Sequence, residues 1–209
     1  RALAPLPVAQ ILLTASDIQE RERYVNAKNA LEASLKLGAV PIINENDSVA
    51  TSEIKLGDND TLSAWVAYLV DADALIILTD VDRLYDSDPR SNPQAKRIEV
   101  VKDLKNVEKV AGKAGSSRGT GGMVTKIRAA KIAAEAGIET LIIGGGGAGL
   151  ESLAKGHING TRILAKGNLP TRKAWLSQQK PKGIITIDAG AFKALQNGRS
   201  LLPSGLTNI

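Results

Sequence analysis

Polar side chains that suit an amino-acid ligand follow directly after an apolar run. Asn44, Glu45, Asn46 and Asp47 come immediately after Val40–Ile43. Carboxylates accept hydrogen bonds from an ammonium group, and side-chain amides donate to a carboxylate. The cluster therefore predicts contacts with an amino acid. A turn rich in Asn and Asp is the alternative interpretation of the same residues.

A second polar cluster, Gly57-Asp58-Asn59-Asp60, stands immediately before apolar residues at helical spacing. Asp or Asn is expected at such a point as a helix cap. A cap requires only one of them, so three polar residues exceed that need. We expect at least one of the three to contact or organise a substrate.

A glycine loop leads into a helical pattern at Gly119-Thr120-Gly121-Gly122-Met123-Val124-Thr125-Lys126. The free N–H groups and the positive dipole end of such a helix attract phosphate. Helical side chains lean toward the N-terminus, so the ammonium group of Lys126 can reach an anion held there. The loop is not a Walker A motif. A flexible loop before an ordinary helix with a solvated lysine is the alternative.

The glycines Gly144, Gly146 and Gly149 formally match the dinucleotide-binding spacing. The acidic residue expected about 20 residues further on in such sites is absent from Thr161–Asn168. We interpret this run as a simple turn at the end of a strand.

The elements that would hold these residues alternate between strands and helices. Ser16 and Gln19 have the spacing of a capping box that opens one long helix, with an apolar face through Tyr24, Ala27, Leu31 and Leu35. The next helix is expected where Leu62, Trp65, Val66, Leu69 and Val70 fall at helical spacing. A further helix is expected over 122–136, with Met123, Ile127, Ala130 and Ala134 buried. Strands are expected at 8–14, 40–43, 74–78, 98–101, 140–143 and 161–164.

This alternation predicts an α/β domain with a mostly parallel sheet. The short apolar runs Val40–Ile43 and Ala74–Leu78 are typical of strands buried on both faces. In such sheets ligands bind beyond the carboxyl ends of the strands, where the polar clusters lie. We expect this domain to span residues 1–166, followed by a Pro-containing linker at 167–182 and the start of a second domain at 183–209.

The composition excludes several classes of site and partner. The chain has no cysteine and only one histidine, His157, which excludes thiol chemistry and multi-histidine metal sites. The net charge of +5 comes from scattered basic residues and aromatics are only 3%, so nucleic-acid binding is not expected. No apolar stretch approaches the roughly 20 residues that span a bilayer, and we expect a soluble, cytoplasmic protein without membrane contact.

Three long segments resemble the glutamate-phosphorylating members of the amino acid kinase family: VPIINENDSVATSEIKLGDNDTLSA, LIILTDVDRLYDSDPRSNPQA and GTGGMVTKIRAAKIAAEAGI. The resemblance covers nearly the whole chain and implies a three-layer α/β/α sandwich. A fourth segment, GIITIDAGAFKALQNGRSLLPSG, resembles the beginning of a small, mostly β PUA domain.

The resemblance implies transfer of the ATP γ-phosphate, with Mg²⁺, to the side-chain carboxylate of L-glutamate. The product would be L-glutamyl 5-phosphate, in the first step of proline biosynthesis. Proline feedback inhibition and a homo-oligomer are implied as well. The metal ligands stay open, because Mg²⁺ can be held mainly by phosphates and water.

The resemblance also implies roles for single residues. Asp47 and Asn59 would contact glutamate, with Asn44 and Asp58 nearby, and Asp60 would organise catalytic lysines. Lys126 would stabilise the charge of the transferred phosphoryl group. The nucleotide would meet Thr79 and Asp80, together with the loop residues Thr120, Gly121, Gly122, Met123, Val124, Thr125 and Lys126.

One departure from the family pattern concerns the N-terminal side. The family's first strand, with a lysine and a phosphate-binding glycine loop, and a second glycine-containing substrate loop have no counterpart here, so we expect the 209 residues alone to be inactive or impaired. The alternatives are a kinase of the same family acting on aspartate, acetylglutamate, carbamate or a nucleoside monophosphate, or a non-catalytic amino-acid- or RNA-binding module.

Overall fold

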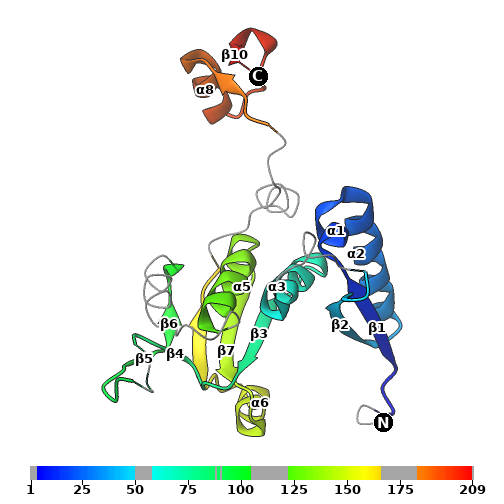
Figure 1. Ribbon diagram of the computed structural model, residues 1–209, viewed down its shortest axis with the longest axis vertical. Coiled ribbons are helices and arrows are strands. Elements are labelled where there is room, and N and C mark those ends of the chain that lie inside the picture. The colour runs from blue at the N-terminus through cyan, green and yellow to red at the C-terminus, as the bar shows by residue number, and fades with distance from the viewer. Residues whose placement is uncertain are drawn as a thin grey trace. The chain divides into compact units, whose positions relative to one another are not determined.

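The computed structural model describes residues 4–49, 58–87, 89, 91–104, 122–165 and 183–208 (Figure 1). The chain separates into two compact units, Arg1–Ala174 and Trp175–Ile209. The predicted linker, 167–182, lies outside the described residues.

The first unit begins with two parallel strands, β1 (Val8–Leu13) and β2 (Val40–Glu45), in register from Val8 opposite Val40 to Leu13 opposite Glu45. The connection between them was predicted as one long helix, and that prediction is wrong. The segment forms α1 (Ala15–Gln19) and α2 (Arg21–Lys36), separated by the extended residue Glu20.

The predicted capping box was also assigned to the wrong residues. Thr14 is the N-cap, and Asp17 Oδ2 accepts hydrogen bonds from the Thr14 backbone N at 2.7 Å and from Thr14 Oγ1 at 2.6 Å. An N-cap needs extended dihedrals, which Thr14 has as the first residue after the strand (φ −114°, ψ 168°). Ser16 already lies inside the helix.

The apolar face of α2 is mostly as predicted. Tyr24, Ala27 and Leu31 are buried, but Leu35 in the last turn is 49% exposed. Gly38 follows the helix with φ +71°, a conformation that favours glycine and ends the helix at the expected place. Lys28 Nζ donates to the backbone oxygen of Leu69, at 2.9 Å, which ties α2 to the end of α3 (Asn59–Leu69).

A four-stranded sheet forms the rest of the first unit, in the order β3 (Ala74–Thr79), β7 (Glu139–Gly144), β8 (Gly160–Ile163) and β6 (Val100–Val101). The β3–β7 and β6–β8 pairs are parallel, whereas β7 and β8 are antiparallel. The strand predicted at 98–101 is divided between β6 and β5 (Arg97–Ile98), which pairs with β4 (Leu84–Tyr85). The α/β class and the mostly parallel sheet are confirmed.

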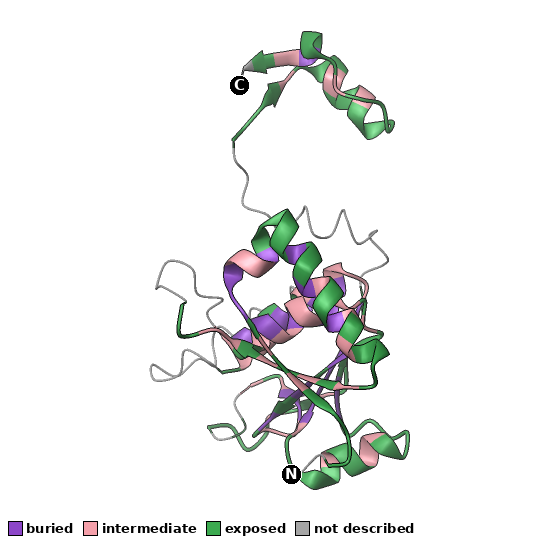
Figure 2. Cartoon of the chain, turned by 90° about the vertical axis from the view of Figure 1, so that its right-hand side faces the viewer, coloured by how far each residue is buried: buried purple, intermediate pink, exposed green. Residues whose placement is uncertain are grey.

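The core lies between this sheet and helices α3 and α5 (Met123–Glu135), with the buried positions where helices meet strands (Figure 2). Ile127, Ala130 and Ala134 of α5 are buried as predicted, and Met123 packs at the edge of the core. Helix α6 (Gly147–Ala154) follows β7.

The prediction that strands 40–43 and 74–78 are buried on both faces is wrong for the described structure. Burial alternates along β3, where Leu75 and Ile77 face the core while Ile76 and Leu78 are 43% and 46% exposed. A run of apolar residues does not reveal which faces are covered, because packing of distant elements decides that. Residues 140–143 of β7 are buried throughout, as predicted.

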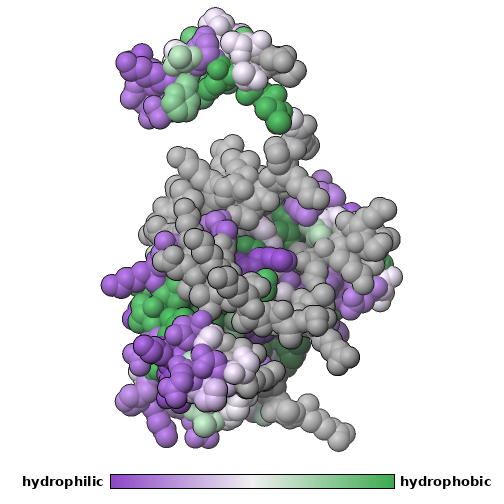
Figure 3. Space-filling view, turned by 60° about the vertical axis from the view of Figure 1, so that its left-hand side comes forward, coloured by the Kyte–Doolittle hydropathy of each residue, from purple (hydrophilic) through white to green (hydrophobic). Residues whose placement is uncertain are grey.

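The second unit contains β9 (Thr186–Ile187), α8 (Ala189–Gln196), a 3₁₀ turn at Pro203–Gly205, and β10 (Leu206–Asn208), which is antiparallel to β9. Large apolar side chains such as Ile184, Phe192 and Leu202 are exposed, and hydrophobic residues are visible on this unit in Figure 3. Among the described residues, no helix is long and apolar enough to cross a membrane.

Two fully buried threonines on paired strands allow a matched test of the core. Thr140 Oγ1 has no hydrogen-bond partner among the described residues, whereas Thr161 Oγ1 accepts from the Leu84 backbone N at 2.9 Å and donates to the Ile98 oxygen. Thr140→Val should raise the free energy of unfolding by about 1 kcal/mol, because it removes an unpaired buried hydroxyl.

Thr161→Val should instead lower the free energy of unfolding by about 1–3 kcal/mol, because it leaves the Leu84 donor unpaired. Urea unfolding of both variants measures the two changes. Equal changes in both would contradict the assigned hydrogen bonds.

Candidate functional site

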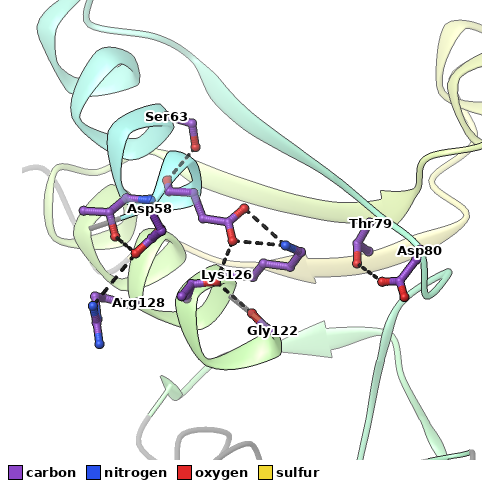
Figure 4. A network of polar contacts seen from close by, with 10 residues as sticks. Asp58, Ser63, Thr79, Asp80, Gly122, Lys126 and Arg128 are labelled. Atoms are coloured by element: carbon purple, nitrogen blue, oxygen red, sulfur yellow. Dashed lines mark hydrogen bonds and ion pairs between the residues drawn. The ribbon is translucent and has the colours of Figure 1, made fainter. Parts of the chain in front are cut away.

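The N-terminal turns of α3 and α5 meet at an ion pair. Lys126 Nζ lies 3.0 Å from Asp60 Oδ2 and 3.2 Å from Asp60 Oδ1 (Figure 4). The side chains of Lys126 and Asp60 are only 14% and 19% exposed. Limited contact with water makes this pair stronger than a surface ion pair. The structure thus brings together the two residues that were predicted as catalytic.

The two helix ends differ in their caps. Asp58 caps α3, with Oδ1 accepting from the Thr61 backbone N at 2.6 Å and Oδ2 from Thr61 Oγ1 at 3.0 Å. Gly122 is the N-cap of α5 and makes no side-chain cap hydrogen bond, and the first turn of α5 contains no acidic residue. The end of α5 therefore presents its positive dipole without a carboxylate on its own first turn.

Thr125, in the first turn of α5, adds a second contact to Asp60. Its Oγ1 lies 2.6 Å from Asp60 Oδ2 and 2.8 Å from the Gly122 backbone oxygen, and the residue is 4% exposed. Met123 and Val124 occupy the first two positions of the helix. The predicted loop residues Thr120 and Gly121 lie outside the described residues.

The residues predicted to bind the amino acid lie at the beginning of α3 and the end of β2. Asn59, the first residue of α3, borders a groove of about 420 Å³ lined mainly by apolar side chains of β2, α3 and β3. Asn44 lies in β2, opposite Leu12 of β1, and Asp47 lies in the turn that follows β2. Asp58 serves as a helix cap, which was the alternative role considered for this cluster.

Thr79 and Asp80 lie at the carboxyl end of β3, where Thr79 Oγ1 donates to Asp80 Oδ1 at 3.1 Å. They line a cavity of about 360 Å³ together with Leu78, Asp82 and Gly144–Gly146. Figure 4 shows Lys126 on the side of the ion pair that faces Thr79.

Sequence reasoning missed two parts of this cavity. The run Gly144–Gly146, interpreted as a simple turn, forms one wall, and the Gly145 backbone N donates to the Thr79 oxygen at 2.7 Å. Position 149 requires glycine because the backbone of Gly144 lies close to it, and a Cβ there would be 2.4 Å from the Gly144 oxygen. The sequence contained a signal for this wall, because the strands predicted at 74–78 and 140–143 end at the same edge of the sheet if they are parallel neighbours.

Asp82 is the second part of this cavity that sequence reasoning missed. Burial raises the pKa of this carboxyl, but hydrogen bonds from Tyr85 Oη at 2.8 Å and Arg83 Nε at 2.9 Å outweigh burial and leave the pKa below its ordinary value. Asp82 is therefore ionised at neutral pH. The described lining of this cavity thus includes two acidic side chains, Asp80 and Asp82.

Metal ligation by the protein has no support in the part of the chain that is described. Those residues contain no group of three or more His, Cys, Asp or Glu side chains that could hold a metal ion.

Comparisons with known proteins agree with this architecture. A protein from Haemophilus influenzae (strain PittEE) named glutamate 5-kinase is 48% identical over 213 residues, which is 100% of this chain and 58% of that protein. A protein of the same name from Xanthomonas oryzae is 51% identical over 205 residues, which is 96% of this chain and 57% of that protein. This chain thus spans a little over half the length of these relatives.

A solved structure supports the fold alone. The UMP kinase from Bacillus anthracis matches with a TM-score of 0.52 at 15% identity, over 80% of this chain and 62% of that one. The model of the amino acid kinase family matches residues 2–144, which include β2, the ion pair of Asp60 with Lys126, and the lining of the cavity beside Thr79 except Gly145 and Gly146. This chain therefore belongs to the amino acid kinase family.

Proposed function

We propose that the whole protein transfers the γ-phosphate of ATP to the side-chain carboxylate of L-glutamate and forms L-glutamyl 5-phosphate, the first step of proline biosynthesis. The relatives named glutamate 5-kinase support this acceptor. The observation that carries the proposal is Lys126, held by Asp60 at a helix N-terminus that has no acidic cap.

The reaction needs little covalent participation from the protein. A carboxylate oxygen of glutamate attacks the γ-phosphorus, a new P–O bond forms, and the bond to the β,γ-bridging oxygen breaks, so that ADP leaves with the electron pair. Negative charge spreads over the γ-phosphoryl oxygens in the transition state. The Lys126 ammonium and the N–H groups of the first turn of α5 would offset that charge.

The nucleotide would extend from this helix end to the cavity beside Thr79 and Asp80. The acidic lining of the cavity suits hydroxyl and amino groups, which donate hydrogen bonds, better than it suits phosphate. The phosphates would therefore lie toward Lys126. Mg²⁺ would accompany ATP, with oxygen ligands from the phosphates and water.

Glutamate would bind between the end of β2 and the beginning of α3. Asn44 and Asn59 offer amide donors for a carboxylate, while Asp47 and Asp58 offer acceptors for the ammonium group. Of these four residues, Asn59 lines the groove of about 420 Å³ described above.

Further parts of the proposal rest on the family resemblance. They are a cytoplasmic homo-oligomer, feedback inhibition by proline, and a PUA domain that begins near Gly183. Nucleic-acid binding is not part of the proposal.

Release of ADP by the whole protein with Mg-ATP tests this function directly. We expect release to depend on L-glutamate, not on aspartate or acetylglutamate, and to fall when proline is added. Release with another acceptor but not with glutamate would assign a different activity within the family. No release with any acceptor would refute the kinase proposal.

Lys126→Ala tests the phosphate-stabilising role. Loss of one preorganised donor typically costs about 10²–10³ in kcat, with a smaller effect on KM for glutamate. Lys36→Ala, at an exposed lysine in the last turn of α2, is the control and should keep the wild-type kcat. An unchanged kcat in Lys126→Ala would exclude the role.

Two substitutions of Asp58 separate the helix cap from substrate binding. Asp58→Asn keeps an oxygen acceptor for the Thr61 N–H and should preserve stability, whereas Asp58→Ala should lower the free energy of unfolding by about 1 kcal/mol. Both variants should raise KM for glutamate, because both remove the charge. If KM stays unchanged in Asp58→Asn, Asp58 acts only as a cap.

A further inference from the structure

Thr125 uses both of its polar donors inside the protein. Its backbone N–H donates to the Gly122 oxygen at 3.2 Å, and its hydroxyl lies within hydrogen-bond distance of Asp60 Oδ2 and of the same Gly122 oxygen. The side chain is almost completely buried. Thr125 was predicted as a nucleotide-binding residue, but no donor is left to point at a phosphate.

Among the described residues, the single hydroxyl proton of Thr125 has two acceptors within hydrogen-bond distance, Asp60 Oδ2 and the Gly122 oxygen. The Gly122 oxygen already accepts the Thr125 backbone N–H. Asp60 Oδ2 is nearer, at 2.6 Å, and belongs to the carboxylate that forms the ion pair with Lys126, so a hydrogen bond to it is charge-assisted and stronger. The proton is therefore donated to Asp60.

We propose that Thr125 is a positioning residue that acts on the reaction through Asp60 rather than through the nucleotide; this inference rests on the kinase function proposed above. The hydroxyl fixes Oδ2, the oxygen that is also nearer to Lys126 Nζ. Two donors on one oxygen hold the carboxylate in one orientation. They also divide its negative charge, so that the ammonium group can turn to a phosphoryl group.

Without the hydroxyl, Asp60 loses one donor and can rotate. Lys126 then becomes the principal partner of the carboxylate and is held away from the phosphate. The net free-energy contribution of a hydrogen bond to a charged group corresponds to a rate change of about tenfold or more. We expect kcat of Thr125→Val to fall by this factor. Nucleotide affinity should not change, because Thr125 does not contact the nucleotide.

The experiment compares Thr125→Val, Thr125→Ser and Thr140→Val in the whole protein. Thr140→Val is the matched control, since it makes the same change at a fully buried threonine whose hydroxyl has no partner among the described residues. We expect Thr125→Val alone to lower kcat, Thr125→Ser to restore it, and binding of a non-hydrolysable ATP analogue to stay at the wild-type level in all three.

A double-mutant cycle tests whether the effect passes through Asp60. In an Asp60→Asn background, Thr125→Val should have little further effect on kcat, because residues that act as one unit are not additive. Additive effects would overturn the proposal. So would weaker binding of the ATP analogue with kcat unchanged, or a serine variant as slow as the valine variant.

Failure of the two proposals can be distinguished. The kcat ratio of variant to wild type is measured with any acceptor that supports ADP release. If glutamate does not support release, the proposed substrate is refuted, but the ratio can still be measured with another acceptor. An active wild type with an equally active Thr125→Val variant refutes only the role of Thr125. If Thr125→Val does not fold, Thr125→Ala replaces it with the same expected outcomes. Absence of ADP release with every acceptor overturns both proposals.

Discussion

The ion pair between Asp60 and Lys126 joins the beginnings of two helices that are far apart in the sequence. Its geometry requires that α3 and α5 start at the same level and lie close together. Asp60 of α3 brings a carboxylate to the beginning of α5, where the N-cap Gly122 makes no side-chain hydrogen bond and the first turn has no acidic residue. The pair therefore depends on the register of the two helices, and the chemistry proposed for Lys126 depends on the pair.

Small side chains permit that close approach. Ala64 and Ala67 of α3, and Ala129, Ala130 and Ala133 of α5, are buried in one core cluster with Leu75 and Ile77 of β3. Alanine lets helix backbones approach without a loss of conformational entropy in the side chain. The same packing seats both helices on the sheet, so the helix ends and the strand ends are positioned by one core.

The parallel pair β3–β7 provides the second constraint. Its register places Thr79 opposite Gly144, and the Gly145 N–H closes the turn onto the Thr79 oxygen. The run Gly144–Gly146, which was interpreted from the sequence as an ordinary turn, therefore forms one wall of the cavity that Asp80 and Asp82 also line. At the other end of α3, the Lys28 ammonium binds the Leu69 oxygen and Asp71, which links the β1–β2 layer to this helix.

The sequence by itself determined the features that depend on nearby residues. These are the α/β class, the helix that begins after Gly122, the helix end at Gly38, and the polar clusters at the ends of apolar strands, because turns, caps and periodicity are local properties. The break at Glu20 and the uncovered face of β3 were not predictable in this way. The family resemblance implied that Asp60 organises catalytic lysines, but caps and periodicity gave no sign of it. The tertiary structure decided that Asp60 meets Thr125 and Lys126, residues 65 and 66 positions away. Such contacts depend on helix packing and strand register, which couple distant residues through the core and leave no periodic signal in the sequence.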